Sequence, residues 1–97
     1  MSNATIQRRL LEIAKRLRVA NEELAVVEEQ FQALSEAADE ARVRSLVSET
    51  PLAHREYIEA QRHADAMGRS RNNLLASIED MRRTQNELLD RLVATPD

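Results

Sequence analysis

The sequence predicts an all-α protein: an antiparallel two-helix coiled-coil hairpin, which we expect to dimerise into a four-helix bundle. Two long runs of apolar residues keep the period of about 3.5 residues that a coiled-coil seam requires. The residues that break helices gather at one place near the middle of the chain. The 97 residues are 42% hydrophobic but only 2% aromatic, which is typical of a helical rod with a thin core. Together these observations predict one hairpin domain spanning residues 1–97.

The first helix is expected at residues 5–47 and carries the first seam. Its apolar residues are spaced alternately four and three apart, which places them on one stripe of a helix. The first seam consists of Ile6, Leu10, Ile13, Leu17, Ala20, Leu24, Val27, Phe31, Leu34, Ala38 and Ala41.

A turn is expected at residues 48–50, where the sequence reads Ser-Glu-Thr before Pro51. Proline fixes its own backbone angle, lacks an amide hydrogen and disfavours the helical region for the residue before it. Thr50 is therefore the expected N-cap, and Pro51 is the expected first residue of the second helix.

The second helix is expected at residues 51–93 and carries the second seam, which two polar residues, Arg71 and Gln85, interrupt. Glycine costs a helix about 1 kcal/mol relative to alanine, so an alternative fold with three helices and a break near Gly68 stays open. The apolar members of the second seam are Ala53, Tyr57, Ala60, Ala64, Met67, Leu74, Ile78, Met81, Leu88 and Leu92.

The two seams also predict a register. In an antiparallel pair, facing seam residues have numbers with a constant sum, and the sum that suits the short turn is 98, as for Leu24 with Leu74. A register shifted by one heptad aligns the seams too, but it lengthens the turn. Charge supports the antiparallel pairing, because residues 22–40 carry seven acidic residues and no basic one. The facing stretch of the second helix carries Arg55, Arg62, Arg69 and Arg71, interleaved with Glu56, Glu59 and Asp65.

The polar seam residues Arg71 and Gln85 are predicted to set the register, because buried polar groups in coiled coils fix alignment or partner number. Arg71 is expected to reach Glu23 or Glu28, and Gln85 to bond a side chain of a partner chain. The alternative is that both residues are ligands inside a bundle cavity.

Six apolar residues fall outside the seams, on one flank of the hairpin, and widen its apolar stripe. We interpret this association flank as a surface for self-association or for a partner. It consists of Leu11, Ala14, Ala25, Leu75, Leu89 and Val93. At the turn, Leu46, Val47 and Leu52 are apolar without a seam partner and form a second candidate contact surface, the tip.

The sequence predicts no catalytic, cofactor or metal site, and therefore no enzyme. It contains no cysteine and no glycine-rich phosphate loop. His54 and His63 point to different flanks, so they do not jointly hold a metal. The net charge is only −3 and no long apolar run exists, so we expect neither a nucleic acid nor a membrane as partner.

Cytoplasmic residence is the default for such a chain without a secretory signal. Lys15 is the sole lysine among 14 basic residues, which suggests a GC-rich bacterial genome.

The paired helices resemble the small helical hairpins exported by type VII secretion, which have a similar length and turn at a Trp-x-Gly motif. This chain has no tryptophan and turns at residues 48–50. Tyr57 lies within the second helix with Gln61 four residues later, so the tail signal of that family is not matched. The resemblance implies an exported hairpin.

Pro51 followed by Arg55 and Glu56, with Gln85 late in the chain, is similar to the all-helical chorismate mutases. That resemblance implies an enzyme that binds a dianionic substrate through these last three residues. The lysine that the family carries late in its long first helix is missing here.

The hairpin also resembles the coiled-coil arm of Gre-type transcript cleavage factors, which enters RNA polymerase. Those arms carry a cluster of acids at the tip to hold magnesium, whereas this turn offers only Glu49 between Arg44 and Arg55. The resemblance implies a regulator that binds RNA polymerase without the cleavage role.

The function that the sequence favours is that of a small non-enzymatic coiled-coil adaptor. We expect it to bind a second copy of itself and an unidentified helical protein, because its apolar surplus is arranged as helix-packing surface.

Overall fold

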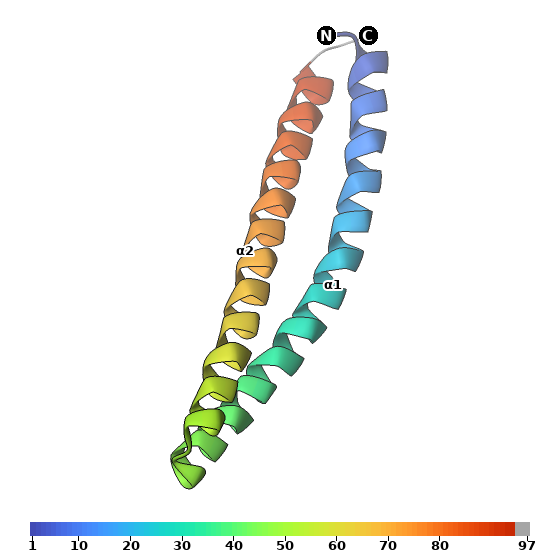
Figure 1. The fold of residues 1–97 in the computed structure, drawn as a ribbon. Helices are drawn as coiled ribbons and strands as arrows, with labels where there is room; N and C mark the ends of the chain where they lie inside the picture. Colours follow the sequence, from blue (N-terminus) through green and yellow to red (C-terminus); the bar gives the residue numbers. More distant parts are fainter. Residues whose placement is uncertain (95–97) are drawn as a thin grey trace. The chain divides into compact units, whose positions relative to one another are not determined.

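The computed structural model describes residues 1–94, which form two long helices and no strand (Figure 1). Helix α1 spans Asn3–Ser48, and helix α2 spans Pro51–Ala94. The predicted all-α helical hairpin is confirmed, and the predicted spans 5–47 and 51–93 lie within these helices. Residues 95–97 of the predicted domain lie outside the described residues.

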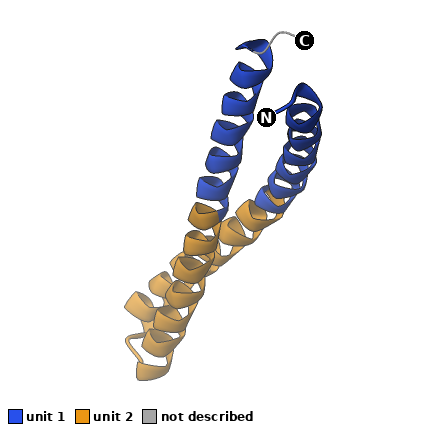
Figure 2. Ribbon diagram, turned by 90° about the horizontal axis from the view of Figure 1, so that it is seen from above, with its two compact units in different colours: residues 1–24, 74–97 blue, residues 25–73 orange. Residues whose placement is uncertain are grey.

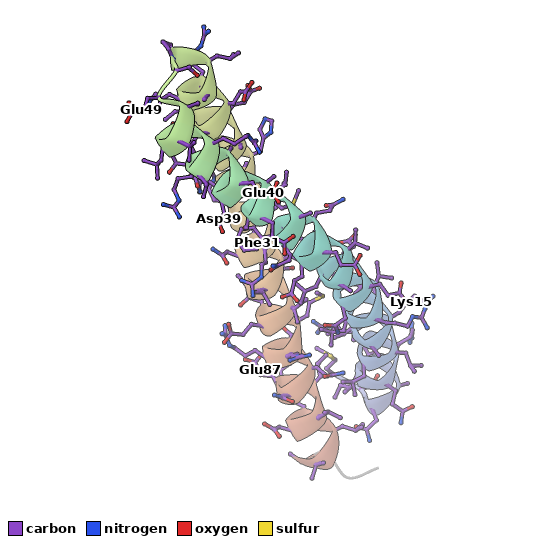
Figure 3. All side chains as sticks on the ribbon, turned by 90° about the horizontal axis from the view of Figure 1, so that it is seen from below. Lys15, Phe31, Asp39, Glu40, Glu49 and Glu87 are labelled. Atoms are coloured by element: carbon purple, nitrogen blue, oxygen red, sulfur yellow. The ribbon has the colours of Figure 1, made fainter. Side chains whose placement is uncertain are left out.

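Helix α2 is continuous across Gly68, so the alternative fold with three helices is wrong. The reason is packing. A Cβ atom built on Gly68 would lie 3.2 Å from Cε1 of Phe31. The glycine thus lets the only phenylalanine of the chain, labelled in Figure 3, lie against the backbone of α2. This contact offsets the poor helix propensity of the glycine.

The chain divides into two compact units, coloured separately in Figure 2. Unit 1 comprises residues 1–24 and 74–97, of which 95–97 are not described. Unit 2 comprises residues 25–73 and contains the turn between the helices. Each unit therefore contains one segment of α1 and one segment of α2.

Unit 1 has a core of large aliphatic side chains. Its α1 and α2 segments run antiparallel, so that the start of α1 and the end of α2 lie at the same end of the unit (Figure 1). The buried residues are Ile6, Ile13, Leu17, Ala20, Ile78 and Leu88, and Leu10, Leu24, Leu74, Met81 and Leu92 pack against them. All of these are residues of the predicted seams.

Unit 2 has a core of small side chains. Its buried residues are Ala38, Ala41 and Ala64, each exposing 3% of its surface or less. Because interaxial distance depends on the side chains at the contact, alanine pairs allow close approach of two helices. The same feature limits the apolar area that this unit buries.

Both predicted seams are confirmed, because every one of their residues is buried or half-buried. Two contacts in unit 2 give the register. Phe31 contacts Gly68, and Glu28 pairs with Arg71, so that facing residue numbers add to 99 in both cases, one from the predicted seam sum of 98. The register shifted by one heptad is wrong.

The turn is made by Glu49 and Thr50. Glu49 adopts a left-handed conformation with φ of 52°, and its amide donates to the Ser45 carbonyl at 3.1 Å, which closes α1. The Thr50 hydroxyl accepts a hydrogen bond from the Ala53 amide at 3.2 Å, which confirms Thr50 as N-cap of α2. Pro51 is the first residue of α2, as predicted.

Replacing Glu49 with glycine is expected to stabilise the protein. Only glycine adopts a left-handed conformation without steric cost, so Glu49→Gly should raise the free energy of unfolding by about 0.5–1 kcal/mol. Urea denaturation followed by circular dichroism measures the change. Glu49→Ala is the control, because it removes the charge but keeps the Cβ atom, and it should give no gain. Equal gains in the two variants would show that charge, not backbone conformation, is responsible.

The contact between Gly68 and Phe31 is testable by a double-mutant cycle. In a Phe31→Leu background, Gly68→Ala should stabilise by about 1 kcal/mol, the ordinary propensity difference. In the unmodified chain the gain should be smaller, because the new Cβ meets the Phe31 ring at 3.2 Å. Denaturant midpoints of the four proteins give the coupling. The same gain in both backgrounds would contradict this packing.

Candidate interaction surfaces

Arg71 lies at the edge of the seam in unit 2 and makes an ion pair across the two helices. Its Nε atom donates to Oε1 of Glu28 at 3.2 Å, with side-chain exposures of 35% and 49%. Of the two expected partners, Glu28 is therefore the one that holds it. An ion pair this exposed contributes about 0–1 kcal/mol, so its main effect is on alignment rather than on stability.

Gln85 lies half-buried in the seam of unit 1. Within residues 1–94 its side-chain amide has no hydrogen-bond partner. A half-buried amide is satisfied by water or by a group from another chain. The expectation that Gln85 bonds a partner chain stays a prediction.

The association flank lies mostly in unit 1 and is largely exposed. Leu11 exposes 74% of its surface, Leu89 44% and Val93 87%. Ala14 is also exposed, whereas Leu75 is half-buried. These five residues belong to unit 1, and the exposed Ala25 belongs to unit 2.

The opposite face of unit 1 carries a shallow groove of about 310 Å³ with a charged rim. Seam residues form its floor, and Val19 is its exposed aliphatic residue, at 47%. Lys15, labelled in Figure 3, is one of its rim residues. The lining residues are Lys15, Arg16, Val19, Ala20 and Glu23 from α1 and Leu74, Ser77 and Met81 from α2. The spacing of apolar residues in the sequence did not predict this groove. The small side chains of Ala20 and Ser77, which both line it, are the sequence feature that indicates it.

The tip residues are exposed at the turn end of unit 2. Leu46 exposes 65%, Val47 80% and Leu52 59% of its surface. Val43, which the sequence analysis did not single out, exposes 52%. Beside them, Ser45, Glu49, Thr50, Pro51 and His54 line a shallow hollow.

No group of three or more histidine, aspartate or glutamate side chains within residues 1–94 is arranged to hold a metal ion. Neither α1 nor α2 is apolar over a stretch long enough to cross a bilayer. Arg55 and Glu56, which the resemblance to chorismate mutases singles out, are exposed in unit 2, whereas Gln85 belongs to unit 1.

Comparison with protein families, curated proteins and solved structures finds no match to this chain. Function is therefore inferred from the chain's own surfaces. The association flank and the tip hold the most exposed aliphatic residues of the described chain, such as Val93 and Val47, whereas Val19, Val26 and Ile58 are exposed outside both sets.

Replacing Arg71 with leucine tests whether this residue sets alignment. Leucine at a seam position buries apolar area, and the lost ion pair is worth only about 0–1 kcal/mol. Arg71→Leu should therefore leave the melting temperature unchanged or raise it, as measured by circular dichroism. Arg69→Leu is the control, because Arg69 is exposed and should give no gain. A clear loss of stability in Arg71→Leu alone would mean that the Glu28 pair is a structural support.

Proposed function

We propose that this chain is a non-enzymatic coiled-coil adaptor that pairs with a second copy of itself through the association flank, forming a four-helix bundle. The observation that supports the proposal most is the exposure of Leu11, Leu89 and Val93 on one flank of unit 1. A partner that packs on this flank buries side chains that the hairpin seam leaves in water.

The two faces of unit 1 differ in a way that favours packing by one face only. Arg16, Glu23 and Ser77 line the groove on one face, so that face presents charged and hydroxyl groups. The association flank occupies the other face with aliphatic side chains. Exposed apolar surface rimmed by polar residues is typical of protein interfaces. One apolar face per hairpin limits the bundle to two chains.

Charge on the flank suits a second copy of the same chain. Arg18 and Glu79 occupy the same flank as Leu11, and their residue numbers add to 97, so they lie at nearly one level of unit 1. A two-fold axis parallel to the helices would bring Arg18 of one copy beside Glu79 of the other. An isologous interface requires this kind of self-complementarity.

The adaptor role rests on the second set of exposed apolar residues. Leu46, Val47 and Leu52 belong to unit 2, whereas five of the six flank residues belong to unit 1. One chain therefore carries one surface for its own copy and another for a different protein.

Introducing charge on the association flank should dissociate the dimer. Sedimentation equilibrium of the unmodified chain is expected to give twice the chain mass of 11.1 kDa. Leu11→Glu combined with Leu89→Glu should give the single-chain mass, because four carboxylates would have to be buried in one interface. The unfolding midpoint of the unmodified chain should rise with protein concentration, as mass action requires for a dimer.

Val19→Glu is the matched control, because Val19 is exposed to 47% and Leu89 to 44%, but Val19 lies on the opposite face. This variant should keep the doubled mass. A single-chain mass for the unmodified protein, or a midpoint independent of concentration, would reject the proposal even if the double variant fails to fold.

A further inference from the structure

Met81 contributes both to the core of unit 1 and to the groove on its surface. It is a half-buried residue of the second seam and packs against the buried side chains of the unit. It also lines the shallow groove of about 310 Å³ beside Val19. Leu74 lines the groove too, but the thioether sulfur of a methionine can be oxidised, whereas a leucine side chain is inert.

Small neighbours keep the groove open above Met81. Side chains on a helix lean toward its N-terminus, so Met81 extends over the preceding turn of α2, which contains Ser77. Ser77 and Ala20, the smallest residues of the groove, leave space that larger side chains would fill. A small neutral solute in the groove can therefore reach the Met81 side chain while unit 1 stays folded.

The groove also holds hydrogen-bond donors. The Ser77 hydroxyl, the Lys15 ammonium (labelled in Figure 3) and the Arg16 guanidinium all belong to its lining residues. Neither Lys15 nor Arg16 makes an ion pair with another of residues 1–94. A thioether sulfur is only a weak acceptor, whereas a sulfoxide is polar and accepts through its oxygen. The groove thus offers partners to an oxidised Met81 side chain that the reduced side chain does not use.

We propose that Met81 is a site of reversible oxidation through which hydroperoxides loosen unit 1. The Met81 sulfur takes one oxygen atom from the hydroperoxide and is oxidised by two electrons. The O–O bond breaks, and the hydroperoxide is reduced to water or an alcohol. The sulfoxide oxygen has no hydrogen-bond partner in an aliphatic seam, so the oxidised side chain leaves the seam for the donors of the groove.

The oxidation is reversible by a known class of enzyme. Methionine sulfoxide reductases restore the thioether, with one enzyme for each sulfoxide epimer. In that reaction a dithiol is oxidised to a disulfide, and the oxygen atom leaves as water. Restoring the thioether lets Met81 return to the seam, so the packing of unit 1 follows the supply of oxidant and reductant.

Of the three methionines of the chain, Met81 is the one whose oxidation should affect stability most. Met1 exposes 58% of its surface and precedes α1, so its oxidation alters no seam packing. Met67 is half-buried in the seam of unit 2, where the buried residues are alanines. Unit 1 buries larger aliphatic side chains, so displacing a residue from its core costs more.

The inference goes beyond the proposed dimer and does not depend on it, because the groove lies on the face opposite the association flank. Its test compares two full-length variants at one protein concentration. Met67→Leu keeps Met81, Met81→Leu keeps Met67, and Met1 is present in both. Leucine nearly conserves the volume of methionine, so both variants should melt close to the unmodified chain.

Hydrogen peroxide treatment should lower the melting temperature of Met67→Leu by about 5–10 °C, as measured by circular dichroism. Methionine sulfoxide reductases A and B, supplied with dithiothreitol, should restore it. Met81→Leu, treated in the same way, should lose less than about half as much. Mass spectrometry of proteolytic peptides shows which sulfur carries the added oxygen.

A second pair of variants tests the route through the groove, in the Met67→Leu background. Ser77→Leu fills space beside Met81 and should slow its oxidation at least about threefold. Ala76→Leu is the matched control, because Ala76 is exposed and adjacent in sequence but does not line the groove. This control should leave the oxidation rate unchanged.

Several results would overturn the inference. One is an equal or larger loss of melting temperature in Met81→Leu than in Met67→Leu. Another is complete oxidation of Met81 with an unchanged melting temperature, or a loss that the reductases do not reverse. Equal oxidation rates in Ser77→Leu and Ala76→Leu would mean that peroxide does not reach the sulfur through the groove. None of these readouts depends on the mass of the particle, so failure of the proposed dimer is seen separately.

Discussion

The structure depends on one constraint: two helices share a single narrow seam, so their side chains must meet in one register. In unit 2 that register places the Phe31 ring against Gly68 and the Arg71 guanidinium beside Glu28. Both contacts are specific, because a shift by one heptad would set Phe31 against a side chain and leave Arg71 without its carboxylate. Burial of the seam residues stabilises the pairing of the two helices. The two contacts favour this register over one shifted by a heptad.

Side-chain size along the seam differentiates the two units. Ile6, Ile13 and Leu88 fill unit 1, whereas alanine supplies all the buried residues of unit 2. A buried leucine or isoleucine contributes about 1.5–3 kcal/mol, and an alanine far less. Unit 1 is therefore the main source of stability within the hairpin, and it also carries most of the association flank. Unit 2 combines a small core with exposed aliphatic residues around its turn.

Much of this fold follows from the sequence, because seams and proline-based helix starts are local patterns. The seams, the Thr50 cap and the pairing of Arg71 with one of two carboxylates were predictable in this way. The left-handed Glu49 was not, because no glycine marks the end of α1. Gly68 was ambiguous, since propensity argues for a break and only the Phe31 contact argues against it. The groove beside Val19 depends on the sizes of side chains that come from both helices. The spacing of residues along the sequence does not give that information.

The thin seam also links folding to association. Ordering a residue costs about 1.5 kcal/mol in conformational entropy, and only nine of residues 1–94 are buried. Helix hydrogen bonds offset part of that cost, but isolated helices are marginal in water without tertiary packing. The aliphatic side chains of Leu11, Leu89 and Val93 are exposed on one flank of unit 1. Burying them against a second copy would add to the apolar area that unit 1 buries, so we expect association and folding of this chain to be coupled.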